Sequence, residues 1–110
     1  MKSESKLDKI LNKQIFAVTS ECGPPKGADP EIIKKKGALL KGNVDAVNVT
    51  DCQTSIVRMS SIASCAILVQ MGIEATMQMV TRDRNRIAIQ SDIFGGYALG
   101  IKNILCLLQP

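Results

Sequence analysis

The 110-residue sequence contains no histidine and no tryptophan, and aromatic residues make up only 3% of it. Histidine is the commonest metal ligand in proteins, and the four cysteines, Cys22, Cys52, Cys65 and Cys106, form no CxxC pair. The scarcity of aromatic rings argues against single-stranded nucleic-acid binding, which uses such rings to stack bases. We therefore expect no metal site and no nucleic-acid partner.

Long apolar runs are also absent. No run approaches the roughly 18 residues that a membrane-spanning helix needs. The first residues, MKSESKLDKILNK, are polar and lack the apolar centre of a signal peptide. Scattered cysteines in such a chain are typical of a reducing compartment. The sequence thus predicts a cytoplasmic protein with free thiols and no membrane contact.

The overall composition is that of one globular domain covering residues 1–110. Hydrophobic residues make up 45% and charged residues 22% of the chain, which is too apolar for a disordered protein. The net charge of +4 favours anionic ligands such as phosphates. A complete (βα)8 barrel needs about 200 residues or more, so the chain is too short to form one.

The stretch from Glu74 to Leu108 reads as one βαβ unit. Residues 75–80 and 104–108 are nearly continuous apolar runs, which predict parallel strands buried on both faces. Between them, apolar residues recur at roughly helical spacing and predict the buried stripe of a helix: Ile87, Phe94, Ala98 and Ile101. Gly100 fits the position after that helix, where a left-handed backbone is needed. The loop at 81–86 therefore follows a strand, and ligands of α/β folds bind there.

The same alternation is predicted upstream of this unit. Residues 1–13 contribute an N-terminal helix, amphipathic over 3–13, and a strand follows at 14–20. A helix is expected from Asp29 to Lys41, a strand at 44–49, and a helix beginning at Thr54 or Ser55 and ending at Gly72. Alternating strands and helices predict a parallel sheet, either open or half of a barrel. The first strand-to-helix loop contains no GxGxxG motif, which argues against a dinucleotide-binding open sheet.

Several residues with possible chemistry follow these strands. They are Glu21 after the first strand, Thr50 and Asp51 after the second, and Gln78, Thr81, Arg82 and Asp83 at or after the third. Because the carboxyl ends of parallel strands share one edge, we expect these side chains to converge. The stiff Pro24-Pro25 loop is expected to desolvate Glu21 partly, which suits a proton donor. Each residue also has an ordinary interpretation, namely a solvated acid, a capping residue or a solvated arginine loop.

Three segments together resemble one family. FAVTSECGPPKGADPE, VDAVNVTD and TRDRNRIAIQSDIFGGYALGIKNIL are similar to segments of the methylenetetrahydrofolate reductases, in the same order, over about residues 4–108. That resemblance implies an α/β fold of parallel βαβ units, the first four strands of a (βα)8 TIM barrel. Members continue with Gly-Asp where this chain has Leu108-Gln109-Pro110, so the resemblance implies a truncated N-terminal half-barrel.

The resemblance also implies roles for particular residues. Glu21 would be the general acid that protonates the folate substrate at N10. Thr50 would contact FAD near N5, with Thr81 and Arg82 close by. Gln78, where many members have a histidine, would contact both cofactor and substrate. NAD(P)H or another donor would reduce FAD, which then passes hydride to 5,10-methylenetetrahydrofolate and yields 5-methyltetrahydrofolate.

Two other functions fit the same residues. One is a non-catalytic α/β half-barrel that serves as an assembly module, and the other is a different folate or pterin barrel enzyme such as a methyltransferase. A half-barrel leaves both outer strands unpaired and apolar surface exposed. We therefore expect a homo-oligomer or a completing partner chain.

Overall fold

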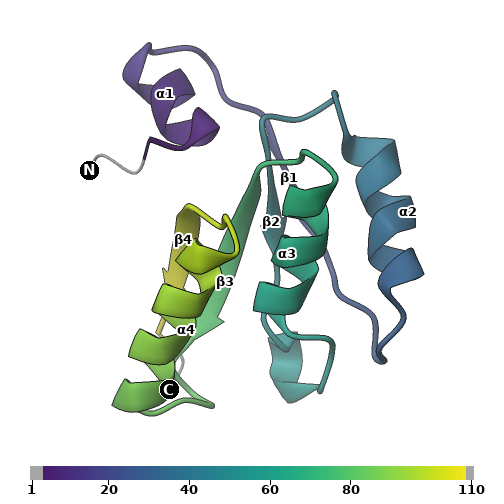
Figure 1. The fold of residues 1–110 in the computed structure, drawn as a ribbon, viewed down its shortest axis with the longest axis vertical. Coiled ribbons are helices and arrows are strands. Elements are labelled where there is room, and N and C mark those ends of the chain that lie inside the picture. Colours follow the sequence, from purple (N-terminus) through teal and green to yellow (C-terminus); the bar gives the residue numbers. More distant parts are fainter. Residues whose placement is uncertain (1–3, 109–110) are drawn as a thin grey trace.

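The computed structural model describes residues 4–108 and contains one four-stranded sheet with helices packed against one face (Figure 1). The strands are β1 (Thr19–Cys22), β2 (Ala46–Val49), β3 (Ala75–Val80) and β4 (Asn103–Leu107). The helices are α1 (Lys6–Asn12), α2 (Pro30–Leu40), α3 (Ser61–Gln70) and α4 (Arg86–Ala98), with a short 3-10 helix, η1 (Gln53–Ser55). All strands pair in parallel in the order β1-β2-β3-β4. This confirms the predicted α/β fold, which matches the first four βα units of a TIM barrel.

The core lies between the sheet and the helices. Alternate strand residues point into it, and their side chains are almost fully buried: Cys22, Val47, Val49, Ala75, Met77 and Met79. Helices and loops contribute Ile33, Cys65, Leu68, Ile73 and Ile101 to the same cluster. None of the helices within residues 4–108 combines the length and apolar character that a membrane crossing requires.

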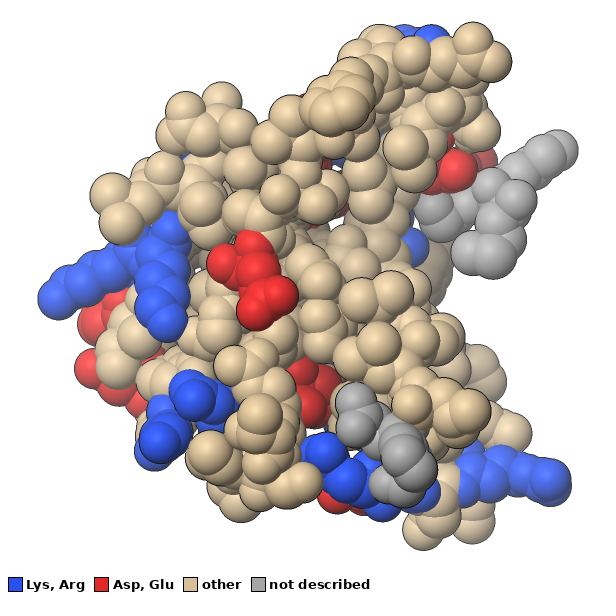
Figure 2. All heavy atoms as spheres, turned by 180° about the vertical axis from the view of Figure 1, so that it is seen from behind, with Lys and Arg blue, Asp and Glu red and all other residues tan. Residues whose placement is uncertain are grey.

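The strand register places one row of side chains on the other face of the sheet. Glu21 pairs with Asn48, Asn48 with Thr76, and Thr76 with Asn103. Helices α2, α3 and α4 lie on the opposite side, so among the described helices only α1 borders this surface, which we call the open face. Figure 2 shows the molecule from behind, with mostly uncharged atoms and with Lys and Arg side chains around the periphery.

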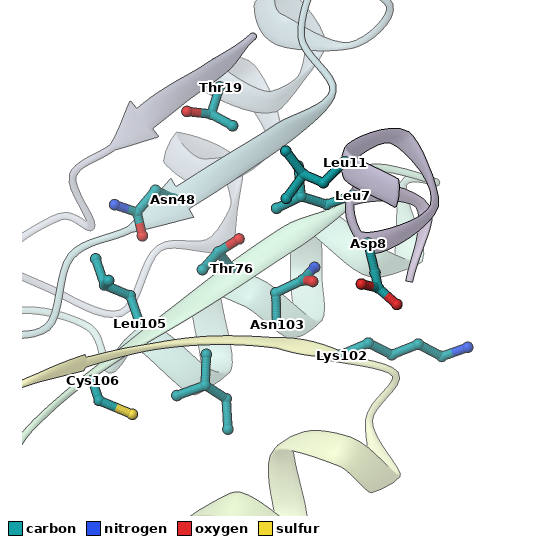
Figure 3. Close-up of a pocket in the computed structure, with 11 residues that line it drawn as sticks. Leu7, Asp8, Leu11, Thr19, Asn48, Thr76, Lys102, Asn103, Leu105 and Cys106 are labelled. Atoms are coloured by element: carbon teal, nitrogen blue, oxygen red, sulfur yellow. The ribbon is translucent and has the colours of Figure 1, made fainter. Parts of the chain in front are cut away.

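Helix α1 lies at the amino ends of the strands (Figure 1). Its backbone N–H at Leu7 donates to Glu74 Oε2 over 2.9 Å, which ties the helix to the residue preceding β3. Leu7 and Leu11 face Thr76 and Asn103 across a cavity of about 570 Å³ on the open face (Figure 3). The helix expected within residues 1–13 therefore closes one end of the sheet, although positions 1–3 lie outside the described residues.

The predicted first strand at 14–20 is wrong in its position. Ile15 and Phe16 are 55% and 88% exposed, and β1 begins only at Thr19. Pairing starts where β2 is available, because Asp45 N–H donates to the Val18 carbonyl over 2.7 Å. An apolar, β-branched segment without a neighbouring strand does not become part of the sheet.

The predicted start of the third helix at Thr54 or Ser55 is also wrong. Both residues have positive φ, 58° and 60°, and belong to η1. Helix α3 begins at Ser61, where the Ser60 hydroxyl accepts a hydrogen bond from Ala63 N–H over 3.2 Å. The intervening loop instead contacts the loop after β1, through Met59 N–H and the Pro25 carbonyl at 2.9 Å.

The predicted buried stripe of the last helix is largely wrong. Ile87 and Phe94 are 79% and 77% exposed, whereas Ile101 is buried. Helix α4 instead turns Gly96 toward the sheet, where an added Cβ would lie 3.1 Å from Met77 Cε. A small residue at this contact lets helix and strand approach closely; Ile89 packs against the core, whereas Ile87 and Phe94 face outward.

Strand β4 is not buried on both faces, contrary to the prediction from its apolar run. Ile104 and Leu105 are 38% and 40% exposed. β4 is an edge strand that pairs only with β3 among the described residues. The predicted glycine end of α4 is confirmed, since Gly100 has φ of +92°.

Gly37 lies inside α2, where glycine lowers helix propensity, and it is fully packed against α3. A Cβ at this position would lie 2.9 Å from Leu68 Cδ2 and 3.1 Å from Met71 Cε. Gly95 in α4 is the counterpart with free space, since nothing lies within 4 Å of the point that a Cβ would occupy there. Comparing substitutions at these two glycines therefore separates the effect of helix propensity on stability from the effect of close packing.

Alanine substitution of these two glycines should change stability by different amounts. Gly95→Ala should raise the free energy of unfolding by about 1 kcal/mol through helix propensity. At Gly37→Ala the same gain is opposed by an overpacking cost of about 1–3 kcal/mol, so this variant should be less stable than Gly95→Ala. Urea unfolding of both variants and the wild type measures the difference. Equal midpoints for the two variants would contradict the close contact between α2 and α3.

The four cysteines are free thiols, and two of them belong to the core. Burial raises the pKa of the Cys65 thiol from its ordinary value of 9.0 to about 12. Burial also raises the pKa of Cys22, against the opposing effect of Lys36. Each thiol therefore stays protonated in the folded chain at pH values where the unfolded chain loses the proton.

This linkage predicts a loss of stability at alkaline pH. The contribution of Cys65 is complete below pH 9 and is lost as pH rises toward about 12, because the unfolded chain alone releases the proton. The slope should reach up to about 1.4 kcal/mol per pH unit for this thiol. Denaturant unfolding between neutral and alkaline pH should show a shallower decline for Cys65→Ala than for wild type. Parallel curves would contradict the assignment.

Candidate functional site

The predicted site residues do meet at the carboxyl-terminal edge of the sheet, which we call the rim. Glu21 is the third residue of β1, not the residue after it as predicted. Thr50 follows β2, and its N–H donates to the Cys22 carbonyl over 3.4 Å. Val49 pairs with Met77, so Thr50 lies beside Gln78. By strand alternation Glu21, Thr50 and Gln78 all project from the open face.

Glu21 is exposed, so the predicted desolvation by the Pro-Pro loop is not found. Pro24 is fully buried and packs into the body of the protein instead of over the carboxylate. Lys36 Nζ donates to the Gly23 carbonyl over 2.7 Å and closes the loop against α2. The loop is therefore held against α2 and leaves the acid accessible.

Thr50 and Gln78 are buried polar residues, 4% and 8% exposed. The Thr50 Oγ1 atom has no hydrogen-bond partner among the described residues. Gln78 is fixed through its backbone, since its N–H donates to Ser61 Oγ over 3.2 Å while that hydroxyl donates to the Val49 carbonyl over 2.9 Å. Buried hydroxyls are normally paired, so the unpaired Thr50 hydroxyl beside an amide side chain is a candidate position for a polar ligand atom. The Ser64 hydroxyl in α3, on the other side of the sheet, is also without a partner among the described residues.

Asp51 is not a turn-capping residue but half of a buried ion pair. Its side chain is 5% exposed and that of Arg84 is 14% exposed, with 2.5 Å between Arg84 Nη1 and Asp51 Oδ2. Val80 N–H also donates to Asp51 Oδ2 over 3.0 Å. The hydrogen bond with Asp51 raises the pKa of Arg84, so the guanidinium stays charged throughout the physiological range.

Arg82 lies on the outside of the same loop. Its Nη2 atom is 2.7 Å from Asp83 Oδ2 and 3.1 Å from the Cys52 carbonyl. The hydrogen bond between these neighbours raises the pKa of Arg82 and lowers that of Asp83. Thr81 is exposed, and its N–H donates to the Leu107 carbonyl over 3.3 Å. Thr81 and Arg82 thus stand at the rim, where they were expected.

Sequence reasoning missed three residues that shape the rim. Arg58 Nη1 donates to the Pro24 carbonyl over 3.0 Å, so it joins the loops after β1 and β2. Ser61 bridges β2 and β3, as described above. Asn48 carries a buried Oδ1 atom without a partner among the described residues and lies opposite Glu21. Only Asn48 had a usable signal, since a polar residue alternates there with Val47 and Val49.

The cavity on the open face adjoins the rim but does not include Glu21, Thr50 or Gln78. It is lined by α1, by one residue each of β1, β2 and β3, and by residues 102–106 along β4, and Leu105 there pairs with Gln78 (Figure 3). Within residues 4–108 no group of three or more His, Cys, Asp or Glu side chains is arranged to hold a metal ion. The rim, with its acid and its buried unpaired hydroxyl, is therefore the candidate site.

Two hydroxyl side chains allow this interpretation of the rim to be tested through stability. Thr50→Val removes a buried hydroxyl that has no partner among the described residues, so the free energy of unfolding should stay equal or rise. Ser61→Ala removes a hydroxyl that both donates and accepts, and should cost about 1–3 kcal/mol. Denaturant unfolding of the two variants measures the contrast. A large destabilisation by Thr50→Val would show that its hydroxyl is already paired within the protein.

Comparison with known proteins gives one result that covers nearly the whole chain. The family model described as methylenetetrahydrofolate reductase matches residues 6–108. No curated protein matches the chain. The matched range contains all four strands, the Pro-Pro loop and the rim residues of the candidate site. The chain therefore belongs to the methylenetetrahydrofolate reductase family, a family of oxidoreductases of folate one-carbon metabolism.

Proposed function

We propose that this chain supplies the acid and the flavin-facing part of a site that reduces 5,10-methylenetetrahydrofolate to 5-methyltetrahydrofolate. NAD(P)H or another donor provides the electrons, and FAD is the cofactor. The observation that supports this most directly is the buried, unpaired Thr50 hydroxyl, which lies beside Gln78 on the same sheet face as Glu21.

The residues present fit a flavin at the rim. FAD supplies a position that accepts and returns hydride, while the protein holds and orients it. Thr50 Oγ1 can donate or accept one hydrogen bond, and the Gln78 amide can do both at once. Gln78 does not titrate, so its contact is independent of pH where a histidine contact would change. Thr81 and Arg82 lie further out on the rim, where they can face the polar parts of the cofactor.

Glu21 is the residue proposed to donate a proton to N10 of the folate. Its carboxylate is exposed and, within residues 4–108, forms no ion pair with a lysine or arginine. An acid that is unpaired is free to bind a substrate nitrogen. Covering it with the folate ring system would remove water and favour the protonated form that the reaction needs.

The proposed site requires further strands. Four parallel strands are half of an eight-stranded barrel, and β1 and β4 each have only one neighbour among the described residues. We propose that four further βα units, in the same polypeptide or in a partner chain, pair with these edges and cover the open face. Their contacts would hold the remainder of the cofactor and folate.

A non-catalytic assembly module remains the second candidate because one observation favours it. The β4 region carries apolar side chains that are open to solvent, with Leu105 40% and Leu108 88% exposed. Such a surface suits association with another protein and does not require catalysis. This module would associate in the same way but would bind neither flavin nor folate.

The half-reactions separate these functions. In the chain assembled with the remaining βα units, Glu21→Gln should slow reduction of methylenetetrahydrofolate by about a hundredfold or more, as expected for loss of a general acid. Reduction of the flavin by the electron donor should be unchanged, because that step needs no proton on the folate. Stopped-flow absorbance of the flavin measures both steps.

Glu31→Gln is the matched control, since Glu31 pairs with Lys34 on the surface of α2. It should leave both half-reactions unchanged. Equal losses in both half-reactions for Glu21→Gln would argue against the acid role. An assembled protein that binds no flavin would favour the assembly module.

A further inference from the structure

The ion pair between Asp51 and Arg84 joins two loops of the rim. Arg84 uses both terminal nitrogens toward Asp51, at 2.5 Å from Nη1 to Oδ2 and 3.3 Å from Nη2 to Oδ1. Its Nη1 also donates to the Val80 carbonyl over 2.9 Å, and its Nε to Asp92 Oδ2 over 3.2 Å. Every nitrogen of the guanidinium therefore has a partner, and the side chain is held in one orientation.

The segment that this pair holds contains the unpaired hydroxyl. Asp51 directly follows Thr50, and the next residue, Cys52, has a left-handed backbone with φ of 44°. Such a conformation is unfavourable for a residue with a Cβ and persists only where the surroundings impose it. The Asp51 contacts with Arg84 and with the Val80 N–H contribute to that restraint, together with the Arg82 hydrogen bond to the Cys52 carbonyl. They fix the backbone on the carboxyl side of Thr50, and the pairing of Thr50 N–H with the Cys22 carbonyl fixes the other side.

Stability alone is a poor explanation for this arrangement. Burying two charges costs desolvation energy that their attraction only roughly repays, so a buried ion pair is weak support for folding. What a two-pronged arginine contact adds is direction, because the planar guanidinium matches both carboxylate oxygens. A lysine would keep the charge but lose this geometry.

We propose that Arg84 is a positioning residue which, through Asp51, sets the orientation of the Thr50 hydroxyl for the cofactor. The identity of the ligand, FAD, rests on the proposed function. The geometry of the Arg84–Asp51 pair does not depend on it. Arg84 directs its guanidinium nitrogens to Asp51, Asp92 and the Val80 carbonyl, so the proposal gives it no contact of its own with the cofactor. Its effect on binding must therefore pass through Thr50.

A double-mutant cycle on the full chain tests this route. FAD is titrated into wild type, Arg84→Lys, Thr50→Val and the double variant, with quenching of flavin fluorescence as the signal. Arg84→Lys and Thr50→Val should each weaken FAD binding about tenfold, the loss expected for one hydrogen bond. The double variant should be no weaker than Thr50→Val alone, because the hydroxyl that Arg84 orients is already gone. Additive losses would overturn the proposal.

A second measurement works without any cofactor. The methyl resonance of Thr50 in the unliganded chain should shift in Arg84→Lys and stay in place in Arg86→Lys, a control on the exposed arginine at the start of α4. The urea midpoint is recorded for each variant, so that a shift caused by unfolding is recognised. An unmoved Thr50 resonance in folded Arg84→Lys would overturn the proposal.

The FAD titration and the Thr50 resonance together distinguish failure of this inference from failure of the proposed function. If wild type fails to bind FAD alone and also fails after assembly with further βα units, the proposed function fails. The Thr50 resonance then still decides the positioning role. If FAD binds but Arg84→Lys binds it as tightly as wild type, the proposed function stands and the positioning role falls.

Discussion

Parallel pairing of the four strands is the constraint on which the candidate site depends. Because Cys22 pairs with Val49 and Val49 with Met77, all residues of one parity face the helices and all residues of the other parity face away. A shift of one residue in any strand would exchange the two sets. The buried apolar set excludes that shift, since it would bring Glu21 or Asn48 into the core. Packing on one face of the sheet thereby fixes the chemistry on the other.

Sequence patterns correctly predicted those elements whose local residues are enough to define them. The second and third strands are short apolar runs between turn residues, and Gly100 ends its helix with the expected positive φ. Errors arose where a distant partner decides the structure. Residues 14–18 have strand composition but no strand beside them, and residues 54–60 have capping residues but are used to join two loops.

Helix α4 shows why apolar spacing could not identify its buried face. Ile87 and Phe94 are as apolar as any core residue, yet the contact with the sheet is made at Gly96. The spacing of apolar residues identifies those that favour burial, but it does not identify the surface against which they are buried. If the further βα units proposed above are present, part of that surface would belong to them. They would also cover Ile104 and Leu105 on β4, which are exposed in the four-stranded sheet.

At the rim, the sequence could identify residues but not their environments. Glu21 and Asp51 are both carboxylates near strand ends, and nothing local distinguishes them. The structure buries Asp51 and gives it Arg84, thirty-three positions away, together with the Val80 N–H. That pairing is set by the tertiary fold and lies beyond the range of local pattern reasoning.

The contrast between the two carboxylates bears on how the proposed acid would work. A buried carboxylate without a partner is expensive, which is why Asp51 is held by an arginine. Glu21 has no such partner among the described residues and is exposed. In the proposed role it must hold a proton when the folate binds, and burial away from any cation is the environment that favours this. Glu21 forms no ion pair with a lysine or arginine among the described residues, but the four strands do not bury it. The strands and ligand that close the open face would therefore create the acid, and completing the barrel and enabling proton transfer would be one event.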